Sequence, residues 1–510
     1  MGENLFAMLA APWTARGDRT VLELPNGAAW SWQQLDSLSA RLAAALTGSG
    51  LVPGDRVSVQ VAKSPEAVAL YLACLRAGLV HHPLNPDYTP AELAYLLGDA
   101  EPAAIVCDPA AEAMLGDLAG RASLWTLDGG GGGSLVAAAA VCPAQTQIAT
   151  RAGADLAALL YSSGTTGRPK GVMLTHANLA ANATALVEAW GFTDADVLLH
   201  ALPMFHAHGL FVALHCAFAS SARLRLLPRF DSAAVVRALP GCSVFMGVPT
   251  HYTRLLADPA FGAEPCRGVR LFISGSAPLL PETFAAFRAR TGQTLLERYG
   301  LTETGMNTAN PLAGERRAGS VGRALPGVAV RIANRSTGAA LPAGDPGEVE
   351  VRGANVFPGY WRAADKTAAA FTADGWFRTG DLGVLDAEGR LTLVGRASDL
   401  IISGGLNVYP REVELCLDAL PGVGESAVVG VPDADFGEAV IAVIEPAAGG
   451  KAPDAAAVIA HARAHLAAYK APKRVFVVAA LPRNAMGKVQ KTVLRRQFAQ
   501  DPAADRLLAS

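Results

Sequence analysis

Several marks of specialised proteins are missing from this sequence of 510 residues. Only 17% of the residues are charged, the formal net charge is -2, and no block of like charges forms a tail. This composition argues against nucleic acid or an anionic membrane surface as a partner. No apolar run reaches the roughly 18 residues of a membrane-spanning helix. The start, MGENLFAMLAAPW, lacks the basic leader and apolar run of a secretory signal, so a cytoplasmic location is expected.

Paired cysteines are missing as well. The seven cysteines are an odd number, are widely spread and include no C-x-x-C pair, so no disulfide framework is indicated. Their apolar neighbours favour small buried side chains in a reducing compartment. The cysteines are Cys74, Cys107, Cys142, Cys216, Cys242, Cys266 and Cys416.

Two catalytic motifs are also absent. The sequence contains no G-x-x-x-x-G-K-[ST], the Walker A loop, and no G-x-S-x-G, the nucleophile elbow of serine hydrolases. Four histidines lie close together (His200, His206, His208 and His215), but no carboxylate or cysteine completes a familiar zinc spacing. Any phosphate or acyl chemistry must therefore use other residues.

The pattern that is present is an alternation of short strand-like runs with Ala- and Leu-rich helical patterns. A chain of this length predicts at least two domains. The run RVSVQV alternates like a strand, and residues 66–77 after it are typical of a helix. Strands separated by helices of this length favour a mainly parallel sheet covered on both faces. The expected strands are 56–61, 102–107, 156–161, 195–202, 244–247 and 271–274.

The character of the sequence changes after about Asn310. Gly and Pro punctuate the short runs VAVRIAN, GEVEVRG and GRLTLVGR, which predict a small β-rich lobe. A compact mixture of strands and helices follows, with helices expected at 410–420 and 455–468. We therefore expect a large domain of residues 1–397 and a smaller one of residues 398–510.

The strongest single signal is YSSGTTGRPKG at residues 161–171. It follows an expected strand and alternates small hydroxyl side chains with glycines. Glycine lets backbone N–H groups approach an anion closely, hydroxyls donate to phosphate oxygens, and a lysine offsets their charge. The segment is therefore predicted to bind phosphates. Its candidate ligands are Ser162, Ser163, Gly164, Thr165, Thr166, Gly167 and Lys170.

This loop resembles the phosphate loop of the adenylate-forming superfamily, which contains acyl-CoA synthetases, nonribosomal adenylation domains and firefly luciferase. The resemblance covers nearly the whole chain. It implies a large α/β N-terminal domain of mainly parallel sheets with a small β lobe, and a mobile smaller α+β C-terminal domain. It also implies ATP, Mg²⁺ and CoA, with an acyl-AMP as the intermediate. The other matching segments are LPMFHAHG, ERYGLTET, FRTGDLG, GRASDLIISGGLNVYPREVE and PRNAMGKVQK.

The resemblance assigns the nucleotide and metal roles to ERYGLTET. Tyr299, followed by Gly300, offers a stacking face to the adenine. Thr302 can donate to the α-phosphate, and Glu303 is a hard oxygen ligand suited to Mg²⁺. Without the resemblance, the segment would be taken for an ordinary helix end.

Further residues follow from the later segments. In the family, the residue matching Asp381 accepts from the ribose hydroxyls and that matching Arg396 contacts ribose or phosphate. Gly404 and Gly405 would let the backbone pass close to the pantetheine arm of CoA. Lys488 would place a cation between the attacking carboxylate and the α-phosphate.

One departure from the family concerns the hinge of the small domain. Two residues after Arg396 the family usually carries Asp or Lys, but this chain has Ser398 followed by Asp399. Serine tolerates varied backbone angles, so it is compatible with rotation, and the sequence leaves open which residue acts as the hinge.

The acyl pocket is expected to hold a second anion. His206 matches the family residue that lines the carboxylate site. Arg229 follows an apolar run, so its guanidinium could project inward, although a surface arginine ending a strand fits the same pattern. Ser274 and Met306 lie in segments that, with GVPTHY and ALPGV, are similar to malonyl-CoA synthetases. That similarity predicts malonate, or methylmalonate, as the small dicarboxylic acid.

Several alternatives remain open from the sequence alone. The substrate could be another short-chain acid, or the acyl group could pass to a carrier protein. A luciferase-like oxygenase shares the first half-reaction, and a nucleotide sensor would not need Glu303, Asp381 and Lys488 together.

Overall fold

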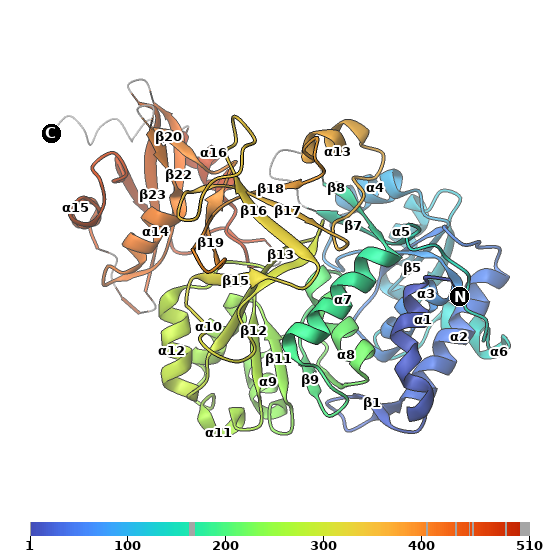
Figure 1. Cartoon of the computed structure of the whole chain (residues 1–510). Helices are drawn as coiled ribbons and strands as arrows, with labels where there is room; N and C mark the ends of the chain where they lie inside the picture. The colour runs from blue at the N-terminus through green and yellow to red at the C-terminus, as the bar shows by residue number, and fades with distance from the viewer. Residues whose placement is uncertain are drawn as a thin grey trace. The chain divides into compact units, whose positions relative to one another are not determined.

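The computed structural model describes residues 2–162, 169–403, 406–433, 436–447, 449–450, 453–484 and 487–499. Contacts between Cα atoms divide the chain into two compact units. The first unit comprises Met1–Val330 and Val351–Phe377, and the second comprises Arg331–Glu350 and Arg378–Ser510. Figure 1 shows the chain, with labels on many of the elements named below.

The first unit contains a six-stranded sheet in the order β6-β5-β3-β4-β7-β8. Neighbouring strands from β6 to β7 are parallel, and β8 at the edge pairs with β7 in the antiparallel direction. The strands are short and largely buried, as expected for a sheet covered on both faces. They are β3 (Arg56–Gln60), β4 (Val80–Pro83), β5 (Ala104–Cys107), β6 (Ser123–Thr126), β7 (Leu156–Ser162) and β8 (Lys170–Thr175).

A second sheet of the first unit runs in the order β15-β14-β13-β12-β11-β9-β10-β1-β2. Its central strands from β13 to β1 are parallel, so their carboxyl ends share one edge, where sites commonly form in α/β folds. The strands are β1 (Thr20–Glu23), β2 (Ala29–Ser31), β9 (Val197–His200), β10 (Arg223–Leu226), β11 (Val244–Gly247), β12 (Leu271–Ser274), β13 (Leu295–Leu301), β14 (Gly305–Ala309) and β15 (Ser320–Ala324).

The helices of the first unit carry clear start and stop signals. In α3, Ser64 caps the N-terminus, Pro65 occupies the first turn and Gly78 ends the helix in the left-handed conformation. The helical segments are α1 (Leu5–Ala10), η1 (Ala11–Arg16), α2 (Trp32–Gly48), α3 (Pro65–Ala77), α4 (Pro90–Ala100), η2 (Pro109–Ala111), α5 (Glu112–Leu118), α6 (Ser134–Val141), α7 (His176–Trp190), η3 (His208–Ala213), α8 (Leu214–Ser220), α9 (Ser232–Ala238), α10 (Pro249–Ala257), α11 (Ala263–Cys266), α12 (Pro281–Thr291) and α13 (Ala364–Ala370).

Four strands pair in the order β16-β17-β18-β19 where the chain passes between the units. These are β16 (Val328–Ala333), β17 (Gly347–Gly353), β18 (Phe377–Leu385) and β19 (Leu391–Arg396). They include the three runs from which the β-rich lobe is predicted.

The second unit has its own sheet, in the order β21-β20-β23-β22, with β24 paired to β23. Val428 of β22 lies in a buried cluster with Leu417 of α14. The next residue of the same strand, Val429, lies in a different cluster with Leu494 of α16. Successive residues of β22 therefore face different layers, as the pleat requires. The elements are β20 (Ile401–Ser403), β21 (Leu406–Val408), α14 (Pro410–Asp418), β22 (Val423–Asp433), β23 (Gly437–Pro446), α15 (Ala455–His465), β24 (Arg474–Val477) and α16 (Lys491–Ala499).

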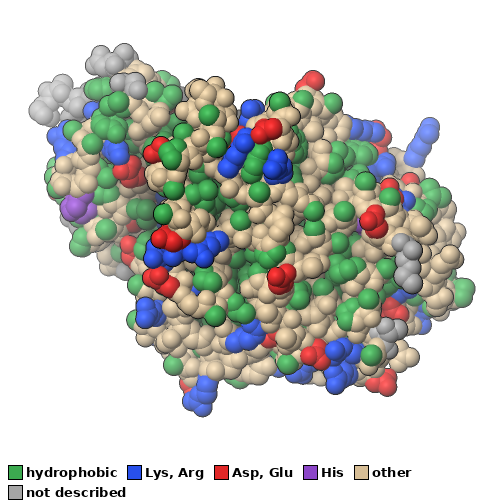
Figure 2. Space-filling model, viewed as in Figure 1, with side chains coloured by type: hydrophobic (Ala, Val, Ile, Leu, Met, Phe, Trp, Pro, Cys, Tyr) green, Lys and Arg blue, Asp and Glu red, His purple; other side chains and the backbone are tan. Residues whose placement is uncertain are grey.

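The predicted mixed α/β fold, with a large N-terminal part and a smaller α+β part, is confirmed. Five of the cysteines are buried, and all seven are free thiols. Within the described chain, no helix is both long and apolar enough to cross a bilayer. On the face shown in Figure 2, side chains of both charge signs are scattered without a large field of one sign.

Candidate active site

The phosphate-loop segment lies between two strands of the six-stranded sheet. Ser162 ends β7 and pairs with Lys170, the first residue of β8, so the two ends of the loop are adjacent. Five predicted ligands, Ser163, Gly164, Thr165, Thr166 and Gly167, lie outside the described residues, and so do Gly404 and Gly405 of the CoA segment.

Helix α4 holds both flanks of this loop. It begins with a capping box between Thr89 and Glu92. Tyr95 and Asp99 are four residues apart and so lie on the same face of the helix. The Asp99 carboxylate accepts a hydrogen bond from the Tyr161 hydroxyl at 2.5 Å, and the Tyr95 hydroxyl donates to the Pro169 carbonyl at 2.9 Å. Burial, with the bond to Asp99, raises the pKa of Tyr161. The hairpin that carries the loop is therefore anchored at both ends.

Tyr360 connects the phosphate-loop lysine with the predicted metal ligand. The Lys170 ammonium lies over the Tyr360 ring, 4.7 Å from its centroid. The Tyr360 hydroxyl donates to Oε1 of Glu303 at 3.1 Å, and the Phe357 N–H donates to the Glu303 carbonyl at 2.8 Å. One hydrogen bond to Oε1 leaves the carboxylate able to bind a hard cation through Oε2, so the donor set fits Mg²⁺.

The ERYGLTET segment is a strand and a turn, not a helix end. Tyr299 is buried in β13 opposite Thr308 of β14. A Cβ on Gly300 would lie 2.0 Å from the Gly305 carbonyl, so this hairpin requires glycine there. Thr302 and Glu303 occupy the turn between the two strands.

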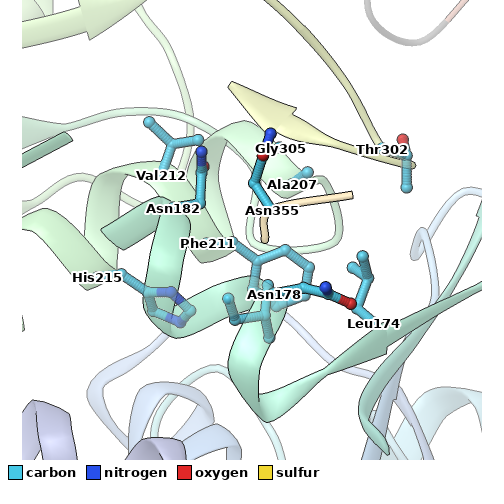
Figure 3. A pocket seen from close by; sticks show the side chains of 11 residues that line it. Leu174, Asn178, Asn182, Ala207, Phe211, Val212, His215, Thr302, Gly305 and Asn355 are labelled. Carbon is cyan, nitrogen blue, oxygen red and sulfur yellow. The ribbon is translucent and has the colours of Figure 1, made fainter. Parts of the chain in front are cut away.

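The acyl segment leads from β9 into the π-helical turn η3. His206 is half-buried in this connection, with its ring centroid 4.7 Å from that of Phe205. Figure 3 shows a pocket lined by Ala207 and Phe211 of this region and by Thr302 and Gly305 of the nucleotide turn. The predicted acyl and α-phosphate segments therefore share one pocket.

A residue that the sequence reading did not single out, Arg298, is buried beside this segment. Its side chain is on β13 and is 3% exposed. Its Nη2 donates to Ser276 Oγ at 3.4 Å, and its Nε has no hydrogen-bond partner among the described residues. Burial lowers its pKa to about 9. A Cβ on Gly275 would lie 2.5 Å from Arg298 Cζ, so glycine makes room for the guanidinium. In the sequence, the signal that could have identified Arg298 is its position as a charged residue within the strand run LLERYGL.

Other polar atoms near Arg298 also lack partners in the described part of the chain. Ser274 Oγ at the end of β12 is one of them, and His208 Nε2 is another. His208 Nδ1 lies 3.3 Å from Ser276 Oγ, and burial together with Arg298 lowers the pKa of His208 well below its usual value. Buried polar groups normally have partners, so these atoms are candidates for contact with a polar ligand.

Arg229 lies in a different environment. It is exposed in the turn after β10, rather than projecting into the interior as expected. The next residue, Phe230, stacks on His251 with ring centroids 3.8 Å apart. Met306, by contrast, is buried, and its backbone N–H and carbonyl both bond to the Asn182 side chain. A contact between Arg229 and the substrate stays a prediction.

In the second unit, Asp381 and Arg396 face each other across β18 and β19. Arg396 Nε lies 2.7 Å from Asp381 Oδ1. The pair joins the two residues assigned to ribose and phosphate. Ser398 lies in the turn after β19, where Asp399 pairs with Arg495 at 3.0 Å.

Lys488 is exposed at the end of a tight loop in the same unit. Asn484 closes the loop, because its N–H donates to the Lys488 carbonyl at 2.9 Å and its Oδ1 accepts from the Lys488 N–H at 3.0 Å. Gly487 supplies the positive φ, +74°, that the turn requires. Asn484 therefore holds the backbone of Lys488 on both its N–H and its carbonyl side.

The four clustered histidines do not form a metal site in the described residues. The set of potential ligands found close together there is Cys416, His461 and His465, in the second unit. Two of the histidines contact other side chains of the protein. His200 contacts Lys63, and His215 Nε2 lies 2.6 Å from the Tyr71 hydroxyl.

Comparisons with known proteins support the adenylate-forming resemblance. A model of the AMP-binding enzyme family matches residues 9–361, and a model of the AMP-binding enzyme C-terminal domain matches residues 412–488. The sulfoacetate–CoA ligase of Cupriavidus necator is 37% identical over 498 residues, covering 96% of this chain and 96% of that protein. The malonate–CoA ligase of Arabidopsis thaliana is 35% identical over 488 residues, covering 88% of this chain and 79% of that protein.

The fold is similar to that of a solved relative. The crystal structure of ATP-bound MatB from Rhodopseudomonas palustris has a TM-score of 0.96 and 48% identity, covering 98% of this chain and 99% of that one. These findings confirm the predicted activity at its coarser level, that of an AMP-forming acyl-CoA synthetase with ATP, Mg²⁺ and CoA. The chain belongs to the AMP-binding enzyme family.

Proposed function

We propose that the enzyme joins a short carboxylic acid with a second anionic group to CoA, with malonate as the first candidate and methylmalonate as the next. The observation that carries this proposal is the buried Arg298, whose Nε has no hydrogen-bond partner among the described residues. The names of the relatives support it, because malonate and sulfoacetate both carry a second anion one carbon away from the reacting carboxylate.

The physical argument concerns desolvation. Moving the distal anion into a closed pocket is unfavourable by several kcal/mol unless the anion is paired and hydrogen-bonded. The planar fork of an arginine matches a carboxylate with two parallel N–H···O bonds. Ser274 Oγ lies at the end of the neighbouring strand and can donate to a remaining lone pair. Acetate would leave this guanidinium buried and unpaired, so the same site selects against monocarboxylic acids.

The predicted site residues serve two successive steps. In the first, a carboxylate oxygen of the acid attacks the α-phosphorus of ATP and pyrophosphate leaves. Glu303 would hold Mg²⁺, which offsets phosphate charge, and Lys488 would stabilise the meeting of two anions. In the second step the CoA sulfur, having lost its proton, attacks the acyl carbon and AMP leaves, giving the thioester.

We propose in addition that residues 398–510 rotate as a domain between these steps, with the turn at Ser398 and Asp399 as the hinge. In the adenylation arrangement Lys488 would reach the nucleotide, and in the thioester arrangement Gly404 and Gly405 would line the path of CoA. Domain closure of this kind commonly completes a catalytic site.

The function is tested by ATP–pyrophosphate exchange without CoA, followed by AMP release with CoA. Malonate, methylmalonate, sulfoacetate, acetate and propionate form the panel. We expect exchange with the dianionic acids and little with acetate. ADP and phosphate as products would overturn the adenylate mechanism, and a preference for acetate or propionate would overturn the dianionic substrate.

A further inference from the structure

Lys63 is a half-buried lysine that the mechanism above does not use. It lies just before the N-cap of α3, and its ammonium makes three contacts with one distant segment. Nζ lies 3.2 Å from His200 Nδ1, 3.1 Å from the His200 carbonyl and 2.9 Å from the Leu202 carbonyl. In the ammonium form of Lys63, these three contacts account for all three protons, and each is directed to the start of the acyl segment. Burial lowers the pKa of Lys63 to about 7.

His200 carries this interaction to the other end of the segment. Its Nε2 lies 2.9 Å from the Gly209 carbonyl, which can only accept, so Nε2 holds the ring proton. Nδ1 then has a lone pair and accepts from Lys63. Burial, and then the charge of Lys63, lower the pKa of His200 to about 3, so the ring is neutral at pH 7. Lys63 and His200 thus bond to carbonyls at both ends of residues 202–209.

The two ends of the segment 202–209 lie against each other. A Cβ on Gly209 would lie 2.1 Å from the Pro203 carbonyl oxygen, so the two ends of the connection are in close backbone contact. Between them lies His206, and the His206 carbonyl accepts from the Leu210 N–H at 2.9 Å. The place of the His206 side chain therefore depends on how residues 202–209 are held.

We propose that Lys63 is a positioning residue, which acts through His200 to hold the acyl segment 202–209 in the geometry that binds the substrate carboxylate. We call the contacts of Lys63 and His200 with the carbonyls of Leu202 and Gly209 the clamp. The identity of the substrate rests on the proposed function, whereas the clamp does not depend on it. Without the ammonium, the Leu202 carbonyl would lose this donor, and His200 would lose one of the two contacts that orient its ring, although the His200 carbonyl would keep its bond from the Leu227 N–H. The segment would then sample other arrangements, at the expense of acid binding.

The test compares Lys63→Met with Lys366→Met, a lysine exposed on α13. Lys63→Met should raise the KM for malonate in pyrophosphate exchange by about tenfold, the scale of losing one net charge-assisted hydrogen bond. The KM for ATP should change less than about twofold, and Lys366→Met should match the wild type. Equal rises in both KM values, or no rise for malonate, would overturn the positioning role.

His200 offers a rescue experiment. His200→Gln keeps one acceptor for Lys63 and one donor for Gly209, whereas His200→Ala removes both. We expect His200→Gln to keep the KM for malonate closer to the wild-type value than His200→Ala does. Combining Lys63→Met with His200→Ala should add little to either change alone, because both break the same connection. Full additivity would mean that the two residues act separately.

A second measurement does not depend on the substrate. Hydrogen exchange in peptides covering residues 202–210 should be at least about tenfold faster in Lys63→Met, while peptides from β11 should be unchanged. If the wild type activates no acid in the panel, the proposed function fails, yet this exchange pattern still supports the clamp. Unchanged exchange in residues 202–210 would overturn the clamp whatever the substrate is.

Discussion

At the scale of single residues, two arginines compete for the distal anion. Arg298 is buried with an unpartnered Nε within the described residues, whereas Arg229 is exposed. Arg298→Met should lower kcat/KM for malonate by about 10²- to 10³-fold, corresponding to about 3–4 kcal/mol for leaving a buried anion unpaired. Activity on acetate should change little or rise. Steady-state kinetics on both acids check this.

The control for this prediction is Arg229→Met in the same assay. If Arg298 holds the anion, Arg229→Met should lower kcat/KM for malonate by less than about tenfold. The reverse order of effects would return the role to Arg229. Loss of malonate and acetate activity alike in Arg298→Met would show that Arg298 serves the fold instead.

The sequence identifies functional residues that lie in a motif more readily than residues whose role depends on their surroundings in the fold. Lys170 and Glu303 are found by motif, and the structure brings them together through Tyr360. Arg298 lies inside a recognised motif, but its burial depends on Gly275, which directly follows another strand, β12. The role of Lys63 is hidden in the sequence for a similar reason, because its partner His200 is 137 residues away. Local pattern carries no information on such pairings.

At the scale of secondary structure, buried strands were the easiest elements to predict. β11 and β12 have the predicted bounds, because short apolar runs between turns are typical of parallel strands. The helix expected at 410–420 ends earlier, at Asp418. The strand-turn-strand form of ERYGLTET was missed, since its pairing with β14 and its glycine contact are formed by tertiary structure.

The end of α14 gives a pH-dependent prediction. The Asp418 carboxylate accepts from the Ser426 N–H at 2.8 Å and from its hydroxyl at 2.7 Å, and burial raises the pKa of Asp418 to about 7. The folded chain therefore binds this proton more tightly than the unfolded chain. The contribution of Asp418 to the free energy of unfolding is therefore fully present below about pH 4, the usual pKa of an aspartate. It is lost as the pH rises through about 7.

Asp418→Asn tests this linkage, because its amide oxygen can still accept from Ser426. Between pH 5 and pH 8 the wild type should lose on the order of 1–3 kcal/mol of unfolding free energy relative to Asp418→Asn. Denaturant unfolding at the two pH values measures the difference. Asp345→Asn, at an exposed position, should show the wild-type pH dependence. Parallel curves for the wild type and Asp418→Asn would contradict the prediction.

At the scale of the whole molecule, the two half-reactions should separate. Glu303 belongs to the first unit and Lys488 to the second. Lys488→Ala should slow adenylation by about 10²-fold or more, the effect of removing one preorganised charge. Thioester formation from supplied acyl-AMP should fall far less, because Lys488 would no longer contact the nucleotide. Equal loss of both steps would argue against domain rotation.

The burial of the cysteines has a consequence for chemical selectivity. An acyl-adenylate is a strong electrophile, and any thiolate within reach could intercept it. Burial raises the pKa of Cys74 and Cys266 to about 12 and of Cys107 and Cys242 to about 11, and it also raises the pKa of Cys216 and Cys416. At neutral pH these sulfurs stay protonated and are poor nucleophiles. Acylation of these six side chains by the adenylate is therefore disfavoured relative to acylation of the thiol that enters from solution.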